Sequence, residues 1–214
     1  MISHNMEQHS EEWWAVRRGI PTASSADKII TSTGKFSTQS KGYAFQLIAN
    51  EVTQEDEQIE QTDWMERGHR LEEEARDWLS FDLGREVKQV GFMTNDDATM
   101  GVSPDGIIED EMAAVESRPS LCSLLEIKCP KGSTHVGYLI SGKLPTTYVA
   151  QCHMAMYISG LPLKFVSYHP DFRPFVIDIK PDDFTEKVGE AVHTFVEYLN
   201  KIRKEITGDS GKPS

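Results

Sequence analysis

The spacing of apolar residues predicts that much of the chain is helical. In the 63–83 segment, Leu71, Ala75 and Leu79 recur at the spacing of one helix face. Ser10 is followed by two acids, then an apolar stretch, two arginines and a glycine, which predicts a short capped helix. The helices expected from such patterns cover residues 10–19, 21–31, 37–52, 63–83, 145–159 and 181–206.

Short apolar runs bounded by turn residues predict strands between these helices. The expected strands cover residues 86–93, 100–103, 106–108, 123–129, 163–169 and 173–180. The last two are separated by Pro170, Asp171 and Phe172, which suit a hairpin. Helices, a small sheet, a helix, a hairpin and a final helix predict a layered α/β (α+β) fold.

No Gly/Ser-rich linker or change in composition divides the 214 residues, so we expect one domain over residues 1–214. The acidic run 51–61 is expected to be a solvated connection, and the polar end 207–214 a flexible tail. The first residues lack the pattern of a signal peptide, and no apolar run approaches the roughly 18 residues that span a bilayer. These features predict a cytoplasmic protein with no membrane contact.

The net charge of −12 excludes a general nucleic-acid coat protein, because such proteins carry a broad basic surface. Contact with a phosphodiester must then be local, and carboxylates that hold divalent cations are one way to make it. The three cysteines, Cys122, Cys129 and Cys152, form no CxxC motif. They therefore indicate buried thiols rather than a disulfide framework, a zinc site or an iron–sulfur site.

One expected strand has an unusual pair of charges. Successive strand residues face opposite sides, so Glu126 and Lys128 share one face. Asp105 lies in a Pro-Asp-Gly turn before it, and Glu72 borders the apolar face of the 63–83 helix. Two Mg²⁺ ions about 4 Å apart can activate water and stabilise a leaving oxygen, and such carboxylates are their natural ligands. Lys128 can orient the water or offset developing negative charge.

Each of these residues also has an ordinary structural interpretation. Asp105 can simply form a turn. Glu126 and Lys128 can be an ion pair on the wet face of an edge strand, and Glu72 can lie on a solvated helix face. The combination of the four residues is what favours a metal-dependent phosphodiesterase.

Five segments resemble, in the same order, the lambda-exonuclease and YqaJ-type viral recombinase family of the PD-(D/E)xK nuclease superfamily. They are WWAVRRGIPTAS, GHRLEEEAR, SPDG, LEIKCP and YVAQCHMAMY, and the resemblance covers about residues 13–157. It implies a restriction-endonuclease-like core, in which helices flank a small mixed β-sheet. It also implies a phage- or prophage-encoded protein in the cytoplasm of a bacterial cell.

The resemblance implies a 5′→3′ exonuclease that degrades one strand of linear double-stranded DNA. The 3′ overhang would pass to a single-strand annealing protein, and the enzyme would be a homotrimeric ring around DNA. Asp105, Glu126 and Glu72 would bind two Mg²⁺ ions, for which Mn²⁺ would substitute, and the carbonyl of Ile127 would complete the ligands. Lys128 would serve the attacking water.

By the same resemblance, Arg17 would bind the 5′-phosphate together with Ser24, Ser103 and Gln151. Arg18 is adjacent and is the alternative. One departure is the 20 residues between Asp105 and Glu126, 106–125, which exceed the family's usual tight hairpin. We interpret them as an extended loop between sheet strands.

Two other interpretations stay open at this level. One is an endonuclease or DNA repair nuclease with the same metal core. The other is a DNA-end-binding scaffold that has the fold but no catalysis.

Overall fold

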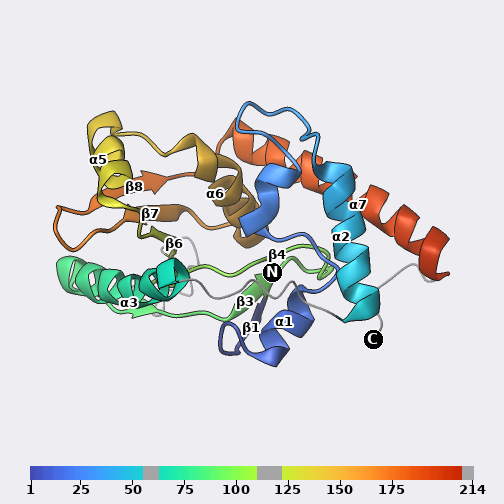
Figure 1. Ribbon diagram of the computed structural model, residues 1–214, viewed down its shortest axis with the longest axis horizontal. Helices are drawn as coiled ribbons and strands as arrows, with labels where there is room; N and C mark the ends of the chain where they lie inside the picture. Colours follow the sequence, from blue (N-terminus) through green and yellow to red (C-terminus); the bar gives the residue numbers. More distant parts are fainter. Residues whose placement is uncertain (55–62, 110–121, 209–214) are drawn as a thin grey trace.

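The computed structural model describes residues 1–54, 63–109 and 122–208 (Figure 1). Its helices are α1 (Glu11–Arg17), the 3₁₀ helix η1 (Ala23–Lys28), α2 (Ser40–Thr53), α3 (Asp63–Leu83), α5 (Gly132–Ser141), α6 (Thr146–Ser159) and α7 (Asp183–Thr207). Its strands are β1 (Ile2–His4), β2 (Val87–Lys88), β3 (Phe92–Thr94), β4 (Gly101–Val102), β5 (Gly106–Ile108), β6 (Ser123–Lys128), β7 (Leu163–Ser167) and β8 (Phe175–Ile179).

The described strands form two sheets. The larger has the order β2-β5-β6-β7-β8, and the smaller has the order β1-β3-β4. In the larger sheet β6 and β7 are parallel and the other neighbours antiparallel, so the sheet is mixed. The expected α+β class is therefore confirmed, and the hairpin of β7 and β8 is present.

The expected strand 86–93 is wrong as a single element, because it divides between the two sheets. Its first part is β2, and its end belongs to β3, which continues to Thr94. A Cβ atom at Gly91, between the two, would collide with the backbone carbonyl of Met6. Gly91 therefore lies against the backbone of the N-terminal segment, at the point where the chain passes from the larger sheet to the smaller one.

Strand β6 lies in the middle of the larger sheet and is buried on both faces. On one face Leu125 and Ile127 pack with Ala75 and Leu79 of α3. On the other face Leu124 belongs to the main core, to which α2, α6, η1 and α7 contribute. Figure 1 shows α3 and α6 on opposite sides of these strands. The interpretation of β6 as an edge strand with a wet face is therefore wrong.

Several element limits differ from the sequence-based expectations. The short helix expected after Pro21 is the 3₁₀ helix η1. Strand β1 and helix α5 were not expected from the sequence. Helix α7 continues through Thr207, with Gly208 as its left-handed cap, so the tail begins later than expected. The rest of the tail, most of the acidic connection 51–61 and most of the 106–125 loop lie outside the described residues.

Within the described part of the chain, no helix combines the length and the apolarity needed to span a membrane. Among the thiols, Cys152 is buried and Cys122 and Cys129 are half-buried, and none of the three forms a disulfide within the described residues. Only Cys152 is thus the fully buried thiol that was expected.

Candidate active site

Asp105 is placed beside the Glu-x-Lys strand by antiparallel pairing. Gly106 of β5 pairs with Leu125 of β6, and the amide of Asp105 donates to the carbonyl of Leu125 at 3.0 Å. One carboxylate oxygen of Asp105, Oδ2, accepts a hydrogen bond from the amide of Ile127 at 2.6 Å. The acid from the Pro-Asp-Gly turn is therefore fixed against the strand that carries Glu126.

Glu126 is buried, with 3 % of its surface exposed. Its Oε1 accepts a hydrogen bond from Nε2 of Gln151 in α6 at 2.5 Å and forms an ion pair with Nζ of Lys128. The ammonium of Lys128 also lies 5.4 Å from the centroid of the Tyr148 ring. This is a desolvated cluster rather than a surface ion pair, and its interactions are correspondingly stronger.

A cavity of about 190 Å³ opens in front of these groups. Its lining contains every side chain of the site expected from the sequence, apart from the alternative Arg18: Arg17, Ser24, Glu72, Ser103, Asp105, Glu126, Lys128 and Gln151. Ile127 takes part through its backbone, by its bond to Asp105. We call this cavity the active-site cavity. The structure brings the predicted residues together, and their catalytic roles stay predictions.

The two carboxyl groups titrate abnormally because they are buried together. Burial raises the pKa of Asp105 to about 6; the charge of Lys128 opposes this rise and the charge of Glu72 adds to it. Burial raises the pKa of Glu126 to about 7, again against Lys128 and with a contribution from Asp105. Burial opposes the charge on Lys128, yet Glu126 and Asp105 overcome it and raise the pKa of Lys128. When both acids are ionised, the single positive charge of Lys128 therefore does not balance their two negative charges.

The raised pKa values predict a cost to stability. Between pH 4 and 7 the folded protein holds more protons on Asp105 and Glu126 than the unfolded chain does, so the free energy of unfolding falls as pH rises. Each of the two acids contributes a cost on the order of 3 kcal/mol at pH 8. Asp105→Asn keeps an oxygen that can accept from Ile127 but removes one charge. Without divalent metal, we expect this variant to be more stable than the wild type at pH 8 by about 1–3 kcal/mol.

Urea denaturation in EDTA at pH 8 and at pH 4 measures this effect. The gain should vanish at pH 4, where both acids are protonated in the folded protein. Asp77→Asn, at an exposed position on α3, is the control and should change stability at neither pH. A less stable Asp105→Asn protein at pH 8 would contradict the electrostatic account.

The oxygen ligands present fit a hard divalent cation. Asp105 and Glu126 supply carboxylates, and the backbone groups of a strand residue point to the same edge, so the carbonyl of Ile127 faces the Asp105 side as its amide does. In the described residues no three His, Cys, Asp or Glu side chains form a metal-binding group. Glu72 therefore lines the cavity without completing such a cluster with the other two acids.

Arg17 is held in the cavity wall by an aromatic surface and a hydroxyl. Its guanidinium carbon lies 3.9 Å from the centroid of the Trp13 ring, and its Nη1 donates to Oγ of Ser103 at 3.3 Å. The same Oγ accepts from Nε1 of Trp13 at 2.7 Å and donates to the carbonyl of Gly91 at 3.0 Å. Arg18 does not line this cavity, so the geometry favours Arg17 as the phosphate ligand.

Two histidines at the cavity were missed from the sequence. The rings of His9 and His69 lie 4.9 Å apart, and His9 also packs against Trp13 at 4.9 Å. Burial, followed by the charges of His69 and Arg17, lowers the pKa of His9. His69 could have been found, because it lies one turn before Glu72 on the same helix. His9 could not, because its place depends on a left-handed backbone (φ 68°) in the N-terminal loop.

The larger sheet is mixed and has helices on both faces. Asp105 lies beside one of its strands, and the next strand carries the Glu-x-Lys pair. This arrangement is the restriction-endonuclease-like fold of exonucleases. Residues 12–162 match the model of the YqaJ-like viral recombinase domain. The chain belongs to this family. None of the curated proteins matches it.

Solved structures agree with this family. Two structures of LHK-Exo, an alkaline exonuclease from Laribacter hongkongensis, are 28% identical, and in each case the match covers 93% of this chain and 97% of that chain. The TM-scores are 0.78 and, for the complex with dAMP, 0.77. A phage-related exonuclease from Haemophilus somnus 129PT is 17% identical, with coverage of 90% and 99% and a TM-score of 0.62, and it supports the fold alone.

Proposed function

We propose that this protein is a Mg²⁺-dependent exonuclease that degrades one strand of linear double-stranded DNA in the 5′→3′ direction. The observation that carries the proposal is the active-site cavity, which places Asp105, Glu126 and Lys128 beside Arg17. Two acids and a lysine suit phosphodiester hydrolysis, and an arginine suits a terminal phosphate. Membership of the family and the likeness to LHK-Exo support an exonuclease acting on DNA.

Different residues of the chain would serve different parts of the hydrolysis reaction. Bound divalent metal would supply Lewis-acid activation of water and charge neutralisation at the phosphorus. Asp105, Glu126 and the carbonyl of Ile127 would hold it, with Glu72 as a further acid at the cavity wall. Lys128 would orient the attacking water or offset the developing negative charge, and Gln151 holds the Glu126 carboxylate in place.

The first test is digestion of linear duplex DNA that is labelled at the 5′ or the 3′ end, with Mg²⁺ or EDTA, beside a covalently closed circle. The proposal predicts Mg²⁺-dependent release of 5′ label as mononucleotides, with the circle intact. Cutting of the circle would show an endonuclease with the same metal core. Binding of duplex ends with no release in Mg²⁺ or Mn²⁺ would show a non-catalytic scaffold.

Arg17→Ala is expected to reduce the preference for 5′-phosphorylated over 5′-hydroxyl ends by about 10- to 100-fold. A guanidinium that stacks on Trp13 is preorganised to donate to a phosphate, and such a charge-assisted contact contributes about 1.5–3 kcal/mol. Initial rates on the two ends measure the preference. Arg173→Ala, an exposed change of the same charge, is the control. Equal rates on both ends before and after the Arg17 mutation would sink this role.

The assembly and the biological setting belong to the same proposal. A homotrimeric ring with inward basic groups would let a chain of net charge −12 enclose DNA. The 3′ overhang would then pass to a single-strand annealing protein. We place this activity in the cytoplasm of a bacterial cell, with the gene carried by a phage or prophage.

A further inference from the structure

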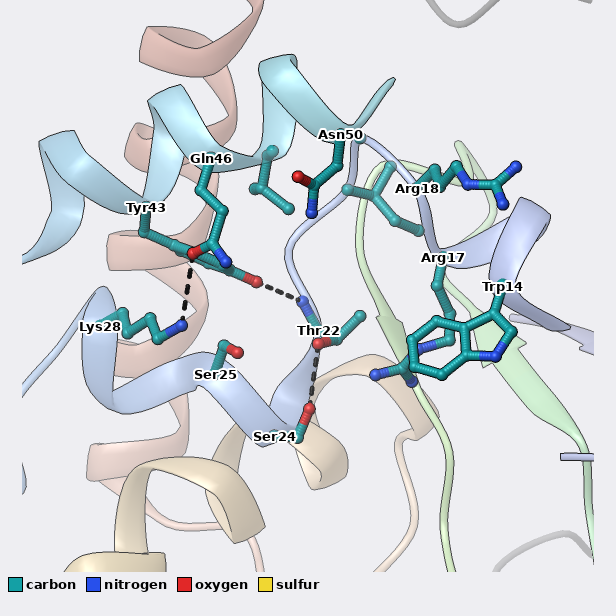
Figure 2. Close-up of a pocket in the computed structure, with 13 residues that line it drawn as sticks. Trp14, Arg17, Arg18, Thr22, Ser24, Ser25, Lys28, Tyr43, Gln46 and Asn50 are labelled. Carbon is teal, nitrogen blue, oxygen red and sulfur yellow. Dashed lines mark hydrogen bonds between the residues drawn. The ribbon is translucent and has the colours of Figure 1, made fainter. Parts of the chain in front are cut away.

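A second pocket of about 260 Å³ adjoins the active-site cavity. The two share Arg17 and Ser24, while Asp105 and Glu126 line only the active-site cavity. Figure 2 shows the second pocket between the end of α1, η1 and α2. The shared residues form its border with the catalytic groups, so it extends the cavity away from them.

The second pocket is cationic in an acidic chain. Arg17, Arg18 and Lys28 line it, and none of the lining residues is acidic among those that the structure describes. Local gathering of positive charge within a chain of net charge −12 indicates a site for an anion. Arginine forks and a lysine ammonium are the groups that proteins use for phosphate.

The wall around Lys28 is ordered by its neighbours. The ammonium of Lys28 lies 5.0 Å from the centroid of the Tyr43 ring and donates to Oε1 of Gln46 at 3.5 Å. The hydroxyl of Tyr43 in turn accepts from the amide of Thr22 at 3.3 Å, so η1 and α2 are tied together across the pocket. The hydroxyls of Thr22 and Ser24 lie 3.1 Å apart at the shared border (Figure 2).

An aromatic side chain completes the chemistry of a nucleotide site. Trp14 lines the second pocket beside the arginines, as Figure 2 shows. A base can stack on an indole without any requirement for sequence, and cationic groups nearby follow the phosphate backbone. The pocket thus offers both a phosphate site and a base platform.

We propose that the second pocket binds one unpaired nucleotide at the 5′ end of the strand, beyond the site of the terminal phosphate. The inference rests on the proposed function, in which the cleaved phosphate lies at Asp105 and Glu126 and the next phosphate in the 5′ direction lies at Arg17 and Ser24. One more nucleotide in the 5′ direction then reaches Lys28. The enzyme therefore accepts a one-nucleotide 5′ overhang and releases a dinucleotide from it.

The chemical step is the same hydrolysis in both cases. Water adds to the phosphorus, the bond from phosphorus to the 3′ oxygen breaks, and that oxygen leaves as a hydroxyl on the released product. The shortened strand keeps a 5′-phosphate. Only the length of the product differs, because the terminal phosphate site holds an internal phosphodiester when the second pocket is occupied.

The test compares blunt duplex DNA with duplex DNA that has a one-nucleotide 5′ overhang, both 5′-phosphorylated and labelled there. The wild type should release a mononucleotide first from the blunt end and a dinucleotide first from the overhang. Lys28→Met should slow dinucleotide release at least about tenfold more than it changes the blunt-end rate. Lys41→Met, an exposed lysine of α2 outside both pockets, should match the wild type on both substrates.

Binding measured without metal distinguishes two ligands of the second pocket, the 5′ end of a DNA strand and a free mononucleotide product. In EDTA, Lys28→Met should weaken a 5′-phosphorylated thymidine dinucleotide at least about tenfold more than thymidine 5′-monophosphate. Equal weakening of both ligands would overturn the proposal and make the pocket a site for free product. Wild-type release of mononucleotides alone from the overhang would also overturn it. Failure of the proposed function appears differently, as no release from either substrate, and the binding comparison then decides the inference.

Discussion

Glu126→Gln is expected to lower nucleotide release from linear duplex DNA by at least about 1,000-fold at pH 8 in Mg²⁺. Glu126 is the buried acid on the central strand, and its carboxylate lies between the ammonium of Lys128 and the amide of Gln151. Glutamine keeps the shape and an accepting oxygen but removes the negative charge that a divalent cation requires. Calorimetric titration with Mn²⁺ should therefore show weaker metal binding by the same variant.

The glutamine variant should stay folded, because removing one charge leaves Lys128 balanced by Asp105. Glu190→Gln, at an exposed position on α7, makes the same chemical change away from the cavity and should keep the wild-type rate. Urea denaturation of both variants excludes loss of fold as the cause. Activity of Glu126→Gln within tenfold of the wild type would remove Glu126 from the metal site.

Lys128→Met is expected to lower the rate by about 100- to 1,000-fold and to tighten metal binding. The methionine cannot orient water or offset negative charge at the phosphate. It also removes the ammonium that lies beside Asp105 and Glu126 and repels a divalent metal from them. The two variants should thus change metal affinity in opposite directions while both lose activity.

Lys128→Met should also destabilise the metal-free protein at pH 8, because two buried acids then have no lysine to balance them. Saturating Mn²⁺ should restore that stability by mass action. Lys143→Met, an exposed surface change, is the control for rate and stability. Weaker Mn²⁺ binding by the Lys128 variant would show that the lysine supports the acids structurally rather than serving the reaction.

The buried environment of Glu126 shows where an inference from sequence succeeds and where it stops. Strand alternation correctly puts Glu126 and Lys128 on one face of β6. Whether that face is exposed to solvent or buried depends on α6 and on β7. Strand β7 pairs with β6 although more than thirty residues separate the two in the chain. A two-residue period reports which side chains lie together, and it does not report what covers them.

Sequence alone determined the main helices, the β7–β8 hairpin, the α+β class, the family resemblance and the acids, lysine and arginine proposed for the candidate site. These follow from local periodicity, capping and short motifs, which depend on neighbours in the chain. Only the tertiary structure decided that the chain changes sheets at Gly91, that His9 reaches His69, and that Arg17 and Ser24 border two pockets. Those features depend on contacts between distant segments, whose approach is set by packing and close backbone passage rather than by any local pattern.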